Sequence, residues 1–470
     1  MNFLGNILNK NKVAIITEND EKITYAKLIS LIENFSKNIK ARFLVFIVCG
    51  NNLESIVSYL GFIKSNCVAT LIDEKIHNTL FLKLVSTYNP NFIFLNKKKI
   101  KNLEGYKIKY TFFNYKLFEK KQKKIIKLDK DLMLLVSTSG STGSSKFVRQ
   151  TYSNLSHNAD SISKYLKISK KDNAITTLPM SYVYGLSVIN THLKKGATIT
   201  LNNSSVVEKI FWDKLYKHKV TNFAGVPYTY EILERIDLKK FNLKYLKYTT
   251  QAGGKLNLKI SEKIINMYKK MKLKLYFMYG AAEATARMSY LPWKDIKNKI
   301  GSIGLPIPGG SLWIENERGI KINSNNKNGE IIFSGPNVCH GYAKNINDLS
   351  KGDENNSVLK TGDIGYKDKD GFFYIIGRKD RYIKIYGQRV NLSEIEDIIH
   401  NIGIQSMCFE EGNNKISVFI KHNNDKKKLI KHLTTVINLH PSSYLIKTVE
   451  KFPMNYNYKV SYNKKELLNK

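Results

Sequence analysis

One stretch of the sequence, Leu132–Lys146, constrains the fold of this chain more than any other. It reads LMLLVSTSGSTGSSK, so an apolar run is followed by small Ser, Thr and Gly residues and then by a lysine. The apolar run predicts a buried strand, whereas the small residues after it have little with which to fill a core. Their backbone N–H groups and hydroxyls, together with one ammonium, can surround a phosphate.

A flexible linker is the alternative interpretation of a run with this composition. Here a strand precedes the run, and an amphipathic helix is expected to open at Ser153, with Leu155, Ala159 and Ile162 on its apolar face. This context favours a phosphate-binding loop. The loop is not of the Walker A type, because no Gly-Lys-Ser/Thr sequence follows Gly140 at the required spacing.

Length and composition indicate a folded protein with more than one domain. The chain has 470 residues, which is too long for one hydrophobic core, and 42% of them are hydrophobic. No uninterrupted run of about 18 apolar residues occurs, so we expect no membrane span. The first residues do not resemble a secretion signal, and the four cysteines lie far apart without metal-binding spacing. These features predict a reduced, cytoplasmic setting.

The formal net charge of +37 is the most unusual property of the composition. A nucleic-acid partner is one explanation for such a charge. However, the lysines are spread along the chain and no nucleic-acid-binding module is recognised, so we expect solvated lysine faces and no nucleic-acid partner. A basic surface would also attract ATP, coenzyme A or an acidic carrier protein.

Strand and helix patterns alternate through the first 130 residues, which predicts an α/β fold with a largely parallel sheet. Phe43–Cys49 is an apolar strand, and Leu60–Ile72 contains the end of a helix, a turn and a strand. A hairpin is expected to turn at Asp370-Gly371 into a strand at 372–376. The pattern changes after Asp380, where a helix capped by Asn391 and several short strands predict a small α+β domain.

A series of short motifs follows the phosphate loop in a fixed order. They are LPMSYVYGL at 178–186, Gly225-Val226-Pro227, Gln251–Gly254, Tyr279–Glu283, GEIIFSGPNVCHGY at 329–342, Thr361–Asp363, Gly377–Asp380 and Phe452–Lys459. In this order they resemble the adenylate-forming (AMP-binding) superfamily, which contains acyl-CoA synthetases, the adenylation domains of nonribosomal peptide synthetases, and luciferases.

The resemblance implies an architecture of two domains. Residues 1–379 would form a large N-terminal adenylation domain of layered α/β sheets with a small β-barrel. Residues 380–470 would form a small, mobile α+β lid that is hinged at Asp380.

The resemblance also implies a site for ATP and Mg²⁺. Tyr279 would stack on adenine beside Gly280, Asp363 would accept hydrogen bonds from the ribose hydroxyls, and Glu283 would hold Mg²⁺. Lys459, Glu283 and Arg378 are the implied catalytic residues, and Lys459 would place its charge at the developing α-phosphate. Arg378 would also bind the nucleotide through ribose or phosphate oxygens. The residues implied to bind the phosphates and the adenine side are Thr138, Ser139, Gly140, Ser141, Thr142, Gly143, Lys146, Gly253 and Gly254.

The acid would occupy a pocket formed by Tyr182, Gly185, Val226, Pro227 and Ala281. Tyr182 stands where acyl- and aryl-activating relatives have a histidine. No acidic residue occurs between positions 173 and 203, and a buried ammonium needs a counter-charge. An acyl or aryl acid is therefore expected rather than an α-amino acid.

The implied enzyme is an acid–thiol ligase that works in two steps. A carboxylate first attacks the α-phosphate of ATP to give acyl-AMP, and a thiol of coenzyme A or of a carrier protein's phosphopantetheine then takes the acyl group, with Gly387 leaving room for it. Amino-acid adenylation for a carrier protein is one alternative. A catalytically weakened nucleotide-binding member is another, because Tyr182, Ala282 and Tyr458 depart from the family pattern.

Overall fold

The computed structural model describes residues 4, 9–37, 39, 41–100, 103–122, 126–137, 146–386, 388–412, 414–421, 426–437, 439–454, 462 and 464–468. The chain divides into two compact units. Unit 1 comprises Met1–Ser311 and Ser334–Leu359, and unit 2 comprises Leu312–Phe333 and Lys360–Lys470. The predicted boundary between residues 379 and 380 lies within unit 2 and stays a prediction, because a division by packing does not locate a hinge.

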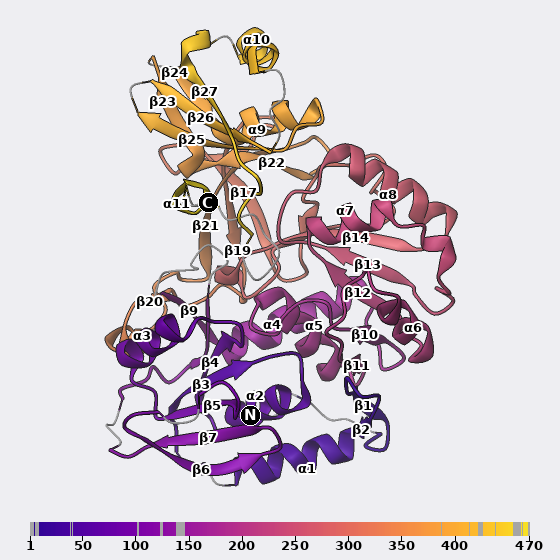
Figure 1. The fold of residues 1–470 in the computed structure, drawn as a ribbon, viewed down its shortest axis with the longest axis vertical. Helices are drawn as coiled ribbons and strands as arrows, with labels where there is room; N and C mark the ends of the chain where they lie inside the picture. Colours follow the sequence, from indigo (N-terminus) through magenta and orange to yellow (C-terminus); the bar gives the residue numbers. More distant parts are fainter. Residues whose placement is uncertain are drawn as a thin grey trace. The chain divides into compact units, whose positions relative to one another are not determined.

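Unit 1 contains a nine-stranded sheet among its described residues (Figure 1). Its central pairs are parallel, and antiparallel strands close both ends. In spatial order the strands are β16 (Leu305–Pro306), β15 (Ser289–Leu291), β14 (Lys274–Tyr279), β13 (Tyr248–Gln251), β12 (Asn222–Gly225), β10 (Asn173–Ile175), β11 (Thr198–Thr200), β1 (Val13–Ile16) and β2 (Lys22–Thr24).

A second sheet of unit 1 has eight strands in the described part of the chain. The neighbouring strands β3, β4, β5 and β8 pair in parallel and are apolar and buried, as expected for strands covered on both faces. In spatial order the strands are β20 (Tyr342–Ala343), β9 (Phe147–Thr151), β8 (Leu132–Ser137), β4 (Val68–Asp73), β3 (Leu44–Cys49), β5 (Phe92–Asn96), β7 (Tyr115–Lys120) and β6 (Tyr106–Phe112).

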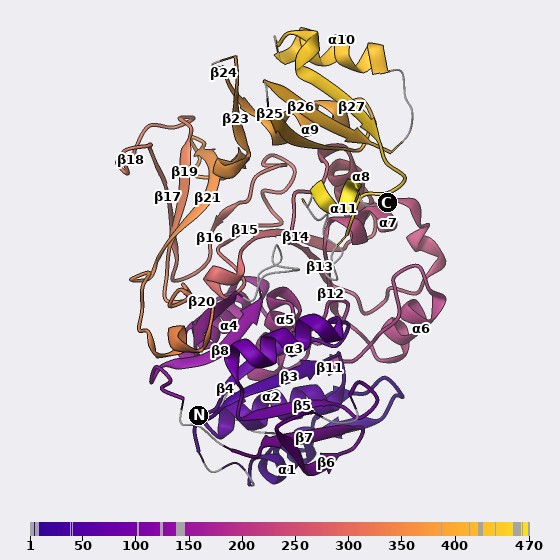
Figure 2. The same cartoon turned by 60° about the vertical axis from the view of Figure 1, so that its left-hand side comes forward.

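Helices connect the strands of unit 1. The α-helices are α1 (Tyr25–Ser36), α2 (Leu53–Lys64), α3 (Asn78–Tyr88), α4 (Tyr152–Leu166), α5 (Val183–Lys194), α6 (Lys209–Lys217), α7 (Pro227–Arg235) and α8 (Leu258–Lys270). The 3-10 helices are η1 (Leu238–Lys240), η2 (Ala282–Ala284) and η3 (Ile346–Ser350). Helices α4 and α5 lie side by side (Figures 1 and 2).

Helix α4 begins one residue before the predicted Ser153, because Thr151 caps it. The Thr151 hydroxyl accepts a hydrogen bond from the backbone of Asn154, and the Asn154 side chain accepts one from the backbone of Thr151. This reciprocal capping box satisfies two backbone donors of the first turn.

Unit 2 contains a five-stranded sheet in the order β18 (Lys321–Ile322), β17 (Ser311–Glu315), β19 (Gly329–Ser334), β21 (Val358–Lys367) and β22 (Phe373–Arg378). Its two end strands do not pair with each other in the described part of the chain, so the predicted closed barrel is not shown. Smaller sheets follow, formed by β23 (Tyr382–Ile385) with β24 (Gln388–Asn391), and by β25 (Ser406–Gly412), β26 (Lys415–Ile420) and β27 (Tyr444–Thr448).

The three-stranded sheet of unit 2 is covered on both faces. Cys408 and Val418 share a core with residues of α9 (Leu392–Asn401) and α10 (Lys426–Ile437), whereas Met407 and Phe419 pack with Leu467 of α11 (Lys464–Leu468). Two 3-10 helices, η4 (Lys379–Arg381) and η5 (Pro441–Ser443), complete the unit. The predicted α/β fold with a largely parallel sheet is confirmed. None of the described helices combines the length and apolarity that a bilayer crossing requires.

Candidate active site

Three of the predicted motifs meet at one edge of the nine-stranded sheet. They follow the adjacent parallel strands β12, β13 and β14, whose register places Gly225 beside Gln251 and Gln251 beside Phe277. The segments that leave these strands are, in order, Val226-Pro227, Gly253-Gly254 and Tyr279-Gly280. Ligands of open α/β sheets bind outside the carboxyl ends of the strands. A small-molecule site is therefore expected along this edge.

Close packing against neighbouring atoms explains two of the glycines at this edge. A Cβ atom on Gly280 would lie 1.8 Å from the carbonyl oxygen of Ala286, so only glycine fits there. A Cβ atom on Gly254 would lie 3.1 Å from Cγ of Pro227, and the Gln251 amide donates to the carbonyl of Gly254 at 2.9 Å. The predicted pocket residue Pro227 and the predicted adenine-side residue Gly254 therefore face each other.

A chain of contacts joins Lys146, Tyr342 and Glu283, which come from three distant segments of unit 1. The ammonium of Lys146 lies 3.2 Å from the centre of the Tyr342 ring. The hydroxyl of Tyr342 donates a hydrogen bond of 2.7 Å to Oε1 of Glu283. Tyr342 reaches this position because β20 pairs with β9, with Tyr342 opposite Val148. One cation, one aromatic ring and one carboxylate are thereby brought together.

The backbone around Glu283 is held by hydrogen bonds from other segments. The carbonyl oxygen of each residue in η2 accepts one hydrogen bond from outside the turn. The donors, in chain order of the acceptors, are the Gln150 amide, the backbone N–H of Cys339 and the Asn337 amide, each at 2.8 Å. Because the whole turn is bonded in this way, the carboxylate of Glu283 starts from a fixed backbone.

Arg149 holds the segment that carries Tyr342. Its side chain is fully buried in β9, and its guanidinium donates to the carbonyls of Tyr342 at 3.1 Å and His340 at 2.5 Å. It also forms an ion pair with Glu354 at 2.5 Å. A buried guanidinium needs this many acceptors to offset its lost hydration. Arg149 therefore fixes Tyr342 from the strand that follows Lys146.

Tyr182 and Gly185 stand at the start of α5. Tyr182 is the N-cap of this helix and is buried, and its ring meets that of Tyr184 edge-on at 6.2 Å. A Cβ atom on Gly185 would lie 2.2 Å from the carbonyl oxygen of Pro179. Glycine is thus required for the first turn of α5 to pass so close to the preceding segment.

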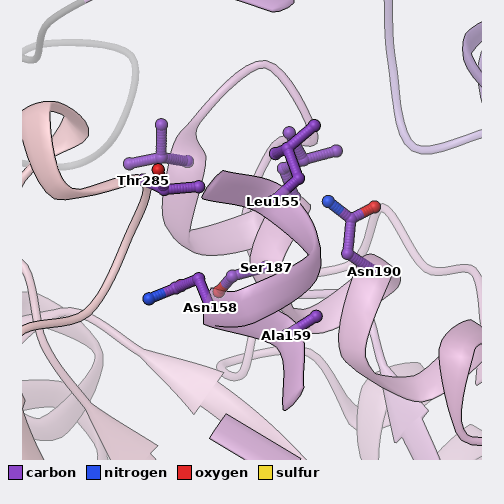
Figure 3. Close-up of a pocket in the computed structure, with 8 residues that line it drawn as sticks. Leu155, Asn158, Ala159, Ser187, Asn190 and Thr285 are labelled. Atoms are coloured by element: carbon purple, nitrogen blue, oxygen red, sulfur yellow. The ribbon is translucent and has the colours of Figure 1, made fainter. Parts of the chain in front are cut away.

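Two cavities lie beside α5. The first is lined by Leu155, Asn158 and Ala159 of α4, by residues of α5 including Ser187 and Asn190, and by Thr285 (Figure 3). The lining of the second includes Ser187 of the same helix, Tyr248 of β13 and Arg287. Both cavities belong to unit 1, and they share Ser187.

In unit 2, Asp363 and Arg378 stand opposite each other on the antiparallel strands β21 and β22. Nε of Arg378 lies 3.5 Å from Oδ1 of Asp363 and 3.5 Å from Oδ1 of Asp380. Gly362 has a φ of 73°, and a Cβ atom there would approach Nη2 of Arg378 to 3.3 Å. The predicted hairpin at Asp370-Gly371 therefore does bring the two predicted ribose-binding residues together.

The donor set for Mg²⁺ is limited to one carboxylate. Within the described residues no group of three or more His, Cys, Asp or Glu side chains could hold a metal ion. Oε1 of Glu283 accepts from Tyr342, which leaves Oε2 for a cation. Mg²⁺ is usually held by one or two carboxylates together with phosphate oxygens and waters, so Glu283 fits a site that a nucleotide would complete.

Several predicted residues lie outside the described residues. They are Thr138, Ser139, Gly140, Ser141, Thr142 and Gly143 of the phosphate loop, Gly387, and Lys459. Of the loop motif, the structure describes only its strand and Lys146. The predicted residues Ala281 and Asp380 lie in described segments, at the N-cap of η2 and within η4.

Sequence reasoning did not single out Tyr342, Arg149, Asn337 or Arg287. Tyr342 lies in a motif that the sequence marks as structural, and its hydrogen bond spans 59 positions. Arg149 is the charged residue in the middle of a buried strand, FVRQT. A charged residue in such a strand was the one available signal, since buried arginines are rare unless paired.

Comparisons with known proteins agree with this arrangement. A family model described as AMP-binding enzyme matches residues 8–343. Oxalate–CoA ligase of Arabidopsis thaliana is 30% identical over 57% of this chain and 52% of its own length. 2-Succinylbenzoate–CoA ligase of Oceanobacillus iheyensis is 27% identical over 84% of this chain and 82% of its own length. The match thus spans about half of the first relative and most of the second.

Solved structures share the fold. The o-succinylbenzoate CoA synthetase of Bacillus subtilis with its acyl-adenylate intermediate has a TM-score of 0.78 at 20% identity, covering 99% of this chain and 98% of that one. The same enzyme with ATP and a magnesium ion has a TM-score of 0.79 at 20% identity, covering 98% of each chain. The predicted resemblance is confirmed by the family model, which covers more than half of the sequence. This chain belongs to the AMP-binding enzyme family.

Proposed function

We propose that this protein is an ATP-dependent acid–thiol ligase. It would activate a small carboxylic acid as acyl-AMP with release of pyrophosphate, and then transfer the acyl group to a thiol of coenzyme A or of a carrier protein's phosphopantetheine. The observation that carries this proposal is the contact chain of Lys146, Tyr342 and Glu283. The relatives named above, which act on oxalate and 2-succinylbenzoate as CoA ligases, support the same reaction.

The first step would depend mainly on aligning the acid with the α-phosphate and on positive charge around the phosphates. The substrate carboxylate is itself the nucleophile, so no protein nucleophile is required. Glu283 would hold Mg²⁺, which when bound supplies positive charge to the phosphate oxygens. Lys146 and the loop residues 138–143 would bind the phosphates, and Lys459 would add charge at the α-phosphate.

The nucleoside would be held by residues with matching chemistry. Tyr279 would stack on adenine, with Gly253, Gly254 and Gly280 allowing close backbone approach. The carboxylate of Asp363 would accept from the ribose hydroxyls, and Arg378 would present its planar fork to ribose or phosphate oxygens. Their mutual distance of 3.5 Å supports this pairing, since a carboxylate is oriented by a neighbouring guanidinium.

The acid would lie against Tyr182, Gly185, Val226, Pro227 and Ala281. Three facts support an acid without an α-ammonium group. Tyr182 and Val226 are buried, no acidic residue lies between positions 173 and 203, and an unpaired buried ammonium is costly. We place the reaction in the cytoplasm, because all four cysteines are free thiols.

A catalytically weakened nucleotide-binding member is the second candidate. It is favoured by Ala282, which stands where the family pattern has a threonine and whose side chain is buried. The two candidates differ in turnover. The first predicts ATP–pyrophosphate exchange that depends on an added acid, whereas the second predicts ATP binding without exchange.

The test is ATP–pyrophosphate exchange with a panel of acyl, aryl and α-amino acids. We expect exchange with at least one acid, abolished in Glu283→Gln, and a thioester product when coenzyme A or a carrier protein is added. Glu262→Gln, on α8, is the matched control and should exchange normally. ATP binding without exchange for any acid would favour the weakened member. Fastest exchange with an α-amino acid would instead identify an amino-acid-activating enzyme.

A further inference from the structure

Arg287 is a buried arginine whose described contacts include no carboxylate. Arg287 is only 3% exposed. Within the described part of the chain, no ion pair joins its side chain to an acidic residue. Its guanidinium lies over the Tyr184 ring, with 3.9 Å from Cζ to the ring centre. Nε donates to the sulfur of Met278 at 3.4 Å, and Nη1 donates to the carbonyl of Ala286 at 3.1 Å.

These partners do not neutralise the charge of Arg287. A thioether is a weak acceptor, and a guanidinium has five N–H donors in a fixed fork. An aromatic face stabilises a cation only in part, and the cost of removing an ion from water is larger than this stabilisation. The charge of Arg287 is therefore only partly compensated, and an anion beside it would be stabilised.

The second cavity beside α5 is the space in which such an anion could bind. Arg287 lines one part of it, and His192, Asn222 and Tyr248 line another. The Tyr248 hydroxyl is buried and has no hydrogen-bond partner among the residues that the structure describes. No carboxylate side chain is among the lining residues. The described lining thus includes one cationic side chain and one hydroxyl that could donate a hydrogen bond, and it includes no anionic side chain.

The other polar groups of the cavity are already occupied by each other. Nδ1 of His192 is bonded to the carbonyl of Val188 at 2.8 Å, so Nε2 accepts from the Asn222 amide at 3.1 Å. The Tyr184 hydroxyl donates to the carbonyl of Thr250 at 2.7 Å. Arg287 and Tyr248 therefore remain as the donors that a ligand could use.

The cavity adjoins the predicted acid pocket. Tyr184, which lies under the guanidinium, directly precedes the pocket residue Gly185 in α5. Thr250 of the cavity lies opposite Ala224 in the sheet register. Ala224 in turn stands two positions before the pocket residue Val226. Two lining residues of the cavity, Tyr184 and Thr250, thus neighbour the predicted acid pocket in α5 and in the sheet.

We propose that this cavity binds a second carboxylate of the substrate acid, with Arg287 as its counter-charge and the Tyr248 hydroxyl as a further donor. The inference rests on the proposed function, and it narrows the substrate to the class of dicarboxylic acids. Arg287 is a specificity-determining residue in this view. It contacts the end of the acid that does not react, so it affects the choice of acid rather than the chemistry of adenylation.

The test compares straight-chain dicarboxylic acids with monocarboxylic acids of the same carbon number in ATP–pyrophosphate exchange. The wild-type protein should use one dicarboxylic acid at least tenfold better than its monocarboxylic counterpart, as a charge-assisted bond requires. Arg287→Met should lose this preference while it keeps or gains activity with the monocarboxylic acid. Arg287→Lys should retain part of it, and Tyr248→Phe should reduce it without loss of charge.

Arg235→Met, an exposed arginine of α7, is the matched control and should leave the preference unchanged. A direct readout is the dicarboxylic acid's upward shift of the melting temperature, which should vanish in Arg287→Met. Equal use of both acid types by the wild type would overturn the inference, as would an unchanged ratio in a folded Arg287→Met. In either case exchange itself persists, whereas failure of the proposed function means that no acid supports exchange.

Discussion

The Tyr342 hydroxyl donates a hydrogen bond of 2.7 Å to the Glu283 carboxylate. The two residues come from separate segments, and further hydrogen bonds hold the backbone of each. Arg149 bonds the carbonyl of Tyr342, and three outside donors bond the turn that carries Glu283. The hydrogen bond therefore sets the direction of the carboxylate, and Tyr342 is a positioning residue for the proposed cation site.

Tyr342→Phe separates this role from the ring's contact with Lys146. The phenyl ring keeps the cation–π contact of 3.2 Å, whereas the hydrogen bond to Glu283 is lost. Because a bond to a charged group contributes about 1.5 kcal/mol or more, the Mg²⁺ concentration for half-maximal pyrophosphate exchange should rise roughly tenfold. Titration of exchange against Mg²⁺ at saturating ATP measures this change.

Tyr216→Phe, on the exposed face of α6, is the control for loss of a tyrosine hydroxyl. Tyr342→Leu should also remove the cation–π contact with Lys146, and the KM for ATP should therefore rise. An unchanged Mg²⁺ requirement in Tyr342→Phe would show that the hydroxyl does not position Glu283.

Features that depend on local sequence could be predicted. The buried strand at Leu132, the cap of α9 at Asn391 and the hairpin turn at Asp370-Gly371 each follow from a few adjacent residues. The turn is the reason that Asp363 and Arg378 could be predicted to meet, because an antiparallel hairpin fixes which residues face each other.

Features that depend on distant segments could not be predicted in the same way. Tyr342 reaches Glu283 only because β20 joins the sheet beside β9. Arg149 and Arg287 are buried, although arginine is normally exposed, and the groups that surround them come from distant segments. The strand order of the five-stranded sheet likewise depends on long-range pairing, and this is why closure of a barrel could not be derived from the sequence.

Asp363→Ala should weaken ATP binding by about 2 kcal/mol, which is the loss expected for charge-assisted hydrogen bonds to the ribose. Calorimetric titration with ATP measures the change. 2′-Deoxy-ATP provides the internal control, since the wild type should bind it less well than ATP and the variant should bind both similarly. Equal ATP affinity in the two proteins would contradict the assignment of Asp363.

The burial of His192 predicts that the protein becomes less stable in acid. Burial lowers its pKa from 6.5 to about 4 in the folded protein, and its ring nitrogens are bonded in a way that suits the neutral form. Above pH 6.5 both the folded and the unfolded states carry neutral His192, so the group has no effect. As the pH falls from 6.5 toward 4, the unfolded state alone takes up the proton, and the free energy of unfolding should fall by up to about 3 kcal/mol.

Denaturant unfolding of the wild type and His192→Asn at several pH values between 4.5 and 7.5 tests this contribution. The variant should show a shallower decline on the acid side, whatever its stability at pH 7.5. His157→Gln, on the exposed side of α4, should follow the wild-type slope. Parallel curves for wild type and His192→Asn would show that His192 does not take part in the acid sensitivity.

The predicted lid assigns different residues to the two half-reactions. Lys459 would act in adenylation, and Gly387 would leave room for the incoming thiol after a rotation of residues 380–470. Both residues lie outside the described residues, so the resemblance of their motifs to the family pattern is the basis of this prediction.

Lys459→Ala should slow adenylation by roughly 100- to 1000-fold, the loss expected when a transition-state charge stabiliser is removed. It should form thioester from supplied acyl-AMP at nearly the normal rate, because the lysine has no part in that step. Gly387→Trp should do the opposite, since a large side chain would obstruct the thiol but not the nucleotide. Pyrophosphate exchange and thioester formation from acyl-AMP, measured separately, distinguish the two steps, with Lys451→Ala as the lysine control. If each variant lost both half-reactions to the same extent, a lid with two working positions would be wrong for this protein.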